Sequence, residues 1–162
     1  MRRLRRQVSL VMLLICAGVS IPVAGQSNAT ANPRIVFVCE HGAAKSVIAA
    51  AYFNKLAAER GLRERAIYRG ASPQAELSVA TLNGLRDDGM SVPSTKPAAI
   101  TAADVAAATH IFAIGCSLSA EASSSGKSAN WTDVPEVSDG YGASRDAIKR
   151  HVEALIDQLA KK

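Results

Sequence analysis

The chain has 162 residues, of which 48% are hydrophobic and only 4% aromatic, and its formal net charge is +5. Four of the positive charges are arginines within residues 1–6, and the rest of the chain carries a net charge of only +1. The basic character therefore does not indicate nucleic-acid binding, and the length suits one ordinary domain with a single core.

Residues 1–25 have the features of a secretory signal peptide in the expected order. The arginines precede an apolar run from Val8 to about Ala17, and small residues follow as far as Gly25. This run is shorter than the roughly 20 apolar residues that a membrane span needs. We therefore expect cleavage after Gly25 and a periplasmic or secreted protein with no stable membrane insertion. An uncleaved membrane anchor is the alternative.

The rest of the chain alternates between strand and helix patterns. Residues 26–33 are small and polar, which predicts a flexible segment, and residues 34–162 form the predicted domain. Residues 117–130 are rich in serine and lack hydrophobic periodicity, so we expect a mobile loop there. The expected elements are a strand at 35–38, a helix at 46–60, a strand at 66–71, a helix at 77–88, a short helix after Thr101, a strand at 110–115 and a helix at 144–159.

This alternation predicts an α/β fold, in which a parallel sheet is covered by helices on both faces. In such folds ligands bind at the carboxyl ends of the strands. Cys39 and Cys116 both follow predicted strands directly. We therefore expect both cysteines to lie at the ligand-binding edge of the sheet.

Cys39 is the strongest candidate for a functional residue. A short loop of small residues separates it from Lys45 and Ser46, which open the first predicted helix. A helix N-terminus presents free backbone N–H groups and the positive end of the helix dipole, which bind anions and stabilise a thiolate. The pattern predicts covalent chemistry by Cys39 on a phosphate-like oxyanion. The predicted oxyanion-binding residues are Glu40, His41, Gly42, Ala43, Ala44 and Lys45.

Cys39, five further residues, Lys45 and Ser46 resemble the phosphate-binding loop of low-molecular-weight protein tyrosine phosphatases and thioredoxin-coupled arsenate reductases. That family has cysteine, five residues, arginine and serine after the first strand. The resemblance extends over about residues 34–159, through the element order, Cys116 and the segment 131–135. It implies a small four-stranded parallel sheet, a small oxyanion or phosphomonoester as substrate, and neither a metal nor an organic cofactor.

The resemblance also implies a role for each site residue. Cys39 is the nucleophile, Ser46 donates a hydrogen bond to its thiolate, and Lys45 holds the oxyanion. Asp133 protonates the leaving oxygen, with Asp139 as the alternative acid. Lys45 stands where the family has arginine, so a point charge replaces a planar fork that grips two oxygens.

Cys116 has two interpretations. In the arsenate reductase branch a cysteine near this position forms a disulfide with the first cysteine and expels arsenite. The third cysteine of that relay is missing here, because residues 123–125 are serines, so a relay would end at Cys39–Cys116 and need an external thiol reductant. Alternatively, Cys116 is a buried small hydrophobic residue.

Two further functions remain open from the sequence. The lysine substitution and Glu40, a negative charge beside an anion site, favour a non-catalytic oxyanion-binding protein derived from a phosphatase. The two cysteines allow a thiol-redox protein. Cys39, His41 and Cys116 lack a recognisable zinc spacing, so we expect no metal site.

Overall fold

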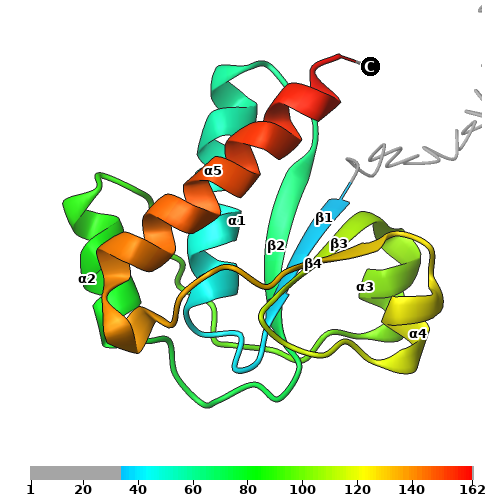
Figure 1. The fold of residues 1–162 in the computed structure, drawn as a ribbon, viewed down its shortest axis with the longest axis horizontal. Helices are drawn as coiled ribbons and strands as arrows, with labels where there is room; N and C mark the ends of the chain where they lie inside the picture. Colours follow the sequence, from blue (N-terminus) through cyan, green and yellow to red (C-terminus); the bar gives the residue numbers. More distant parts are fainter. Residues whose placement is uncertain (1–33, 162) are drawn as a thin grey trace, which may run out of the picture.

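The computed structural model describes residues 34–161, so the predicted signal peptide and the flexible segment at 26–33 lie outside the described residues. Four parallel strands form one sheet in the order β2-β1-β3-β4 (Figure 1). The elements are β1 (Arg34–Cys39), α1 (Lys45–Glu59), β2 (Arg65–Gly70), α2 (Val79–Asp87), α3 (Ala102–Ala107), β3 (Ala108–Ile114), α4 (Ala120–Ser124), β4 (Ser128–Trp131), the 3₁₀ helix η1 (Val137–Asp139) and α5 (Tyr141–Leu159).

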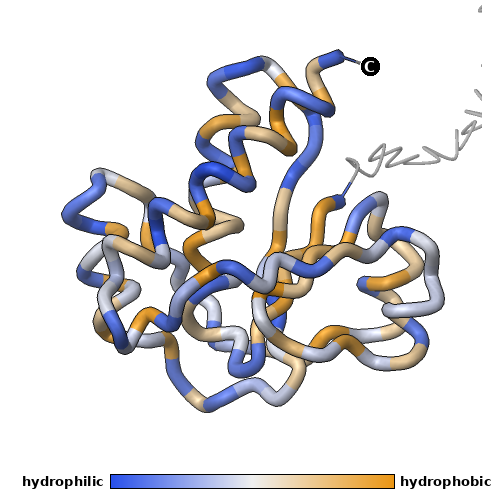
Figure 2. Tube along the Cα trace, in the orientation of Figure 1, coloured by the Kyte–Doolittle hydropathy of each residue, from blue (hydrophilic) through white to orange (hydrophobic). Residues whose placement is uncertain are grey.

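Helices cover both faces of the sheet, as the alternating pattern predicts. Side chains alternate between the faces of a strand, so Phe37 packs toward α1, α2 and α5, while Val36 and Val38 pack toward α3 and α4. Figure 2 shows hydrophobic residues along β1 and at intervals along α5. The predicted α/β class, with a small four-stranded parallel sheet between helices, is confirmed.

One predicted loop proves to be structured. Residues 117–130 contain α4 and most of β4, so the expectation of a mobile loop was wrong. The Ser119 hydroxyl caps α4 by accepting from the Ala122 N–H at 3.2 Å, and β4 pairs with β3 over four residues. β4 is a short edge strand held by backbone pairing, and its largely exposed side chains give no periodic apolar signal.

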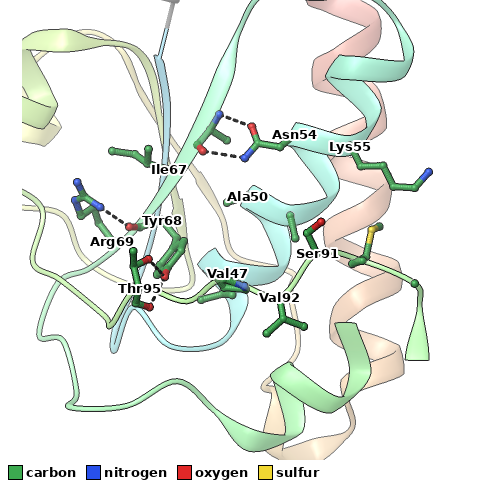
Figure 3. Close-up of a pocket in the computed structure, with 15 residues that line it drawn as sticks. Val47, Ala50, Asn54, Lys55, Ile67, Tyr68, Arg69, Ser91, Val92 and Thr95 are labelled. Atoms are coloured by element: carbon green, nitrogen blue, oxygen red, sulfur yellow. Dashed lines mark hydrogen bonds between the residues drawn. The ribbon is translucent and has the colours of Figure 1, made fainter. Parts of the chain in front are cut away.

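The other edge of the sheet is closed by a side chain. Asn54 on α1 donates to the Ala66 carbonyl at 3.0 Å and accepts from the Ala66 N–H at 2.8 Å (Figure 3). The amide thereby takes the place of a neighbouring strand on β2. Such capping protects an edge strand from pairing with another chain.

Among residues 34–161, no helix is long and apolar enough to cross a membrane.

We expect Asn54→Ala to lower the free energy of unfolding by about 1–2 kcal/mol, because two hydrogen bonds to β2 are lost while alanine gains a little helix propensity. Urea denaturation measures the change. Asn83→Ala is the matched control, since Asn83 is also helical but accepts only from the exposed Arg86 side chain. A loss for Asn54→Ala no larger than that of the control would contradict a clamp on β2.

Candidate active site

Cys39 ends β1 and lies at the bottom of a small cavity. The residue is only 3% exposed, and its Sγ lies 3.2 Å from the Oγ of Ser46, which is completely buried in the first turn of α1. An ionised thiol can only accept a hydrogen bond, so in that state the Ser46 hydroxyl is the donor. The sheet therefore places the sulfur at the N-terminus of α1, where the sequence predicts it.

The loop between Cys39 and Lys45 is held by backbone contacts. Gly42 has φ +61°, and a Cβ at this position would lie 2.7 Å from the Gly70 nitrogen. Only glycine combines this backbone conformation with such a close approach. The carbonyls of loop residues also accept from the segment after β2, in the bonds Ala71 N to Cys39 O at 3.0 Å, Ser72 N to Glu40 O at 2.7 Å and Ser78 N to Ala43 O at 3.0 Å.

Lys45 points into the cavity and is paired there. The residue is 5% exposed, and its Nζ donates to Oε1 of Glu136 at 2.5 Å. Gly115 makes room for the ammonium, because a Cβ at that position would lie 2.9 Å from Nζ. The Glu136 side chain is 63% exposed and also lines the cavity.

The cavity has a volume of about 370 Å³, which is at the small end of ligand pockets. It brings together Cys39, Lys45 and most of the predicted oxyanion-binding loop. Gly42 does not line the cavity but turns the backbone beneath it, and Ser46 acts from the interior. The lining residues are Cys39, Glu40, His41, Ala43, Ala44, Lys45, Gln74, Ser78, Gly115 and Glu136.

Asp133, the predicted acid, is not brought to the cavity. Its Oδ1 lies 2.7 Å from Nε2 of His151, whose ring stacks on Trp131 with centroids 4.6 Å apart. The hydrogen bond with His151 lowers the pKa of Asp133, which favours the ionised form. Two carboxyl groups line the cavity, those of Glu40 and Glu136. The sequence patterns did not indicate Glu136. The sequence feature that could have indicated Glu136 is an acidic residue directly after Pro135.

Cys116 lies on the other side of β1. Its Sγ is 3.5 Å from the Val38 carbonyl, and it packs with the core beneath α3 and α4. It lines a separate hollow rather than the cavity of Cys39, and both thiols are free. Burial raises the pKa of the Cys116 thiol, and the nearby Cys39 and Glu40 add to the increase. The two predicted partners of the disulfide relay are thus both free thiols that pack in different core clusters.

A larger cavity of about 740 Å³ lies between α1, β2 and residues 89–95 (Figure 3). Its lining is mostly apolar, and several of its polar side chains already have protein partners. Tyr68 bonds to Thr95, and Arg69 forms an ion pair with Asp104 at 2.8 Å. Neither cysteine lines it. Among residues 34–161, no group of three or more histidine, cysteine or acidic residues is arranged to hold a metal ion.

Solved structures with this fold include phosphatases and arsenate reductases. YfkJ from Bacillus subtilis matches with a TM-score of 0.68 and 21% identity, over 80% of this chain and 95% of YfkJ. A low-molecular-weight phosphotyrosine phosphatase from Vibrio cholerae gives 0.69 and 18%, over 78% of this chain and 95% of its own. A thioredoxin-dependent arsenate reductase from Corynebacterium glutamicum gives 0.65 and 20%, over 81% and 63%.

These matches show that the chain has the low-molecular-weight phosphatase fold. No model of a known protein family matches the sequence, and no curated protein matches it either. The fold alone hosts more than one chemistry. The function must therefore be argued from the cavity around Cys39.

The two thiols are expected to differ in reactivity. We expect iodoacetamide near neutral pH to modify Cys39 before Cys116, because thiolates are the reactive species and the raised pKa of Cys116 keeps it protonated. Peptide mapping at successive times measures the order. In urea, where the local environments are lost, the two cysteines should react at similar rates. Faster labelling of Cys116 in the folded protein would show that Cys39 is not the activated thiol.

Proposed function

We propose that this protein is an enzyme in which the Cys39 thiolate attacks a phosphate-like oxyanion, either reducing arsenate or hydrolysing a phosphomonoester. One observation carries the proposal. A buried sulfur, 3.2 Å from the Ser46 hydroxyl, shares a small cavity with the Lys45 ammonium at the N-terminus of α1. The solved structures with this fold include proteins named for each of the two activities.

The cavity supplies the parts that such an attack requires. The α1 dipole and the Ser46 hydroxyl stabilise the thiolate. Loop N–H groups and the Lys45 ammonium compensate the negative charge of the oxyanion as sulfur bonds to phosphorus or arsenic. Glu136 is the carboxyl group beside Lys45, where its carboxylate can accept a proton from a ligand hydroxyl and return it to the leaving oxygen. The proposal therefore gives Glu136 the role that the resemblance implies for Asp133.

Arsenate reduction has an additional requirement, because it consumes two electrons from two thiols. Cys39 bonds to arsenic and displaces one of its oxygens, which leaves as water. Attack by a second thiolate on the Cys39 sulfur then breaks the sulfur–arsenic bond, forms a disulfide and releases arsenite. Cys116 lies on the other face of β1 and has a raised pKa. We therefore propose that an external thiol reductant, rather than Cys116, performs the second attack.

A non-catalytic oxyanion-binding protein is the second candidate. The observation that favours it is the pairing of Lys45 with Glu136, which neutralises the one lysine that lines the cavity. Such a site would bind an oxyanion without accelerating its reaction. A binding measurement combined with an activity assay separates the two candidates.

We expect the reduced protein to turn over an aryl phosphate or, with dithiothreitol as reductant, arsenate. Cys39→Ser should abolish turnover, because the nucleophile is lost. Ser46→Ala should lower it by about tenfold to a hundredfold, the cost of one hydrogen bond to a charged group. Cys116→Ser is the control, expected to retain activity with the external thiol. Oxyanion binding without turnover would support the non-catalytic binding protein. Full activity in Cys39→Ser would refute both the Cys39-dependent enzyme and the non-catalytic protein.

We also propose that the protein is exported. The arginines, apolar run and small residues of positions 1–25 support this proposal. We expect N-terminal sequencing of protein recovered from the periplasm or medium to begin at Gln26. An intact chain in the membrane fraction would instead support the uncleaved anchor, and an intact chain in the cytosol would exclude export.

A further inference from the structure

The pairing of Lys45 with Glu136 gives the cavity an unusual composition for an anion site. The buried ammonium already has a carboxylate at 2.5 Å, held from a segment 91 residues further along the chain. The other titratable groups that line the cavity are Cys39, Glu40 and His41. His41 is exposed and its Nδ1 is 3.3 Å from the Ser72 carbonyl. An oxyanion that binds in the cavity therefore contacts a carboxylate beside Lys45, the one lysine among the lining residues.

A carboxylate imposes a chemical condition on that ligand. An ionised glutamate only accepts hydrogen bonds, and the oxygens of a fully deprotonated oxyanion also only accept. A glutamate carboxylate and a fully deprotonated oxyanion therefore cannot form a hydrogen bond with each other, and their charges repel. A ligand that keeps a hydroxyl group can donate to Glu136 while its other oxygens accept from Lys45 and the loop.

We propose that Glu136 determines specificity by selecting oxyanions that keep at least one hydroxyl group. Inorganic phosphate and arsenate satisfy this condition at neutral pH. Sulfate does not, and neither does a phosphomonoester dianion. The inference rests on the proposed function, because it requires an oxyanion in the Cys39 cavity. It narrows the substrate class to hydroxyl-bearing inorganic oxyanions, of which arsenate is the one that a thiol can reduce.

Phosphate and sulfate form a matched pair of probes. In mildly alkaline solution both are mainly dianions of the same shape, but only phosphate has a hydroxyl hydrogen. A difference in affinity between them therefore reports hydrogen bonding and not net charge. Neither probe is consumed by the thiol, so binding can be measured without turnover.

The test is calorimetric titration of the reduced protein with inorganic phosphate and with sodium sulfate. In the wild type we expect phosphate to bind at least about tenfold more tightly, because a site built to accept from a ligand hydroxyl rejects the analogue that lacks it. Glu136→Gln should reduce this ratio at least about tenfold, mainly by improving sulfate binding, because the amide N–H can donate to sulfate.

Glu76→Gln is the matched control. Glu76 pairs with Lys96 at the same 2.5 Å, but both side chains are exposed and neither lines the cavity. This substitution should leave both affinities unchanged. Glu136→Ala provides a second variant that also removes the acceptor, in case the glutamine variant does not fold.

The outcomes separate the inference from the function on which it rests. If phosphate and sulfate bind the wild type equally, or if Glu136→Gln and Glu136→Ala keep the full preference for phosphate, the specificity role is overturned while an oxyanion site remains. If neither ion binds the wild type or the Glu136 variants, the proposed function fails and the inference fails with it.

Discussion

The close contact between Gly42 and Gly70 is the constraint on which the candidate site depends. A Cβ on Gly42 would lie 2.7 Å from the Gly70 nitrogen, and a Cβ on Gly70 would lie 2.8 Å from the Gly42 nitrogen. The loop after β1 and the end of β2 can therefore lie against each other only as bare backbone. This contact sets the path from Cys39 to α1, so the position of the sulfur at the helix N-terminus follows from it.

Lys45 shows how a buried charge is accommodated at that helix. A lysine removed from water is costly unless it is paired. Glu136 supplies the partner, and the missing side chain of Gly115 supplies the space. The Glu136 side chain is largely exposed and lines the cavity, so a ligand there can contact it while it stays paired with Lys45. The contact that stabilises the buried Lys45 is therefore the one that, in our proposal, selects the ligand.

The fold by itself leaves the chemistry open, since its structural neighbours include both phosphatases and an arsenate reductase. The discriminating features are in this chain's own cavity. Lys45 offers one ammonium where the planar fork of an arginine would hold two oxygens, and Glu136 lines the cavity beside it. These two features are the basis of our proposal that the substrate is a small inorganic oxyanion rather than an ester whose phosphoryl group must be held in fixed directions.

The local parts of this protein can be predicted from its sequence. The apolar run of β1, the spacing from Cys39 to Ser46 and the periodicity of α1 and α5 depend on near neighbours, so they were predictable. The partners of the site residues depend on tertiary packing. It pairs Lys45 with Glu136 across 91 residues and diverts Asp133 to His151. It also places Cys116 behind β1. These contacts depend on how distant segments pack, and no local pattern of residues encodes that packing.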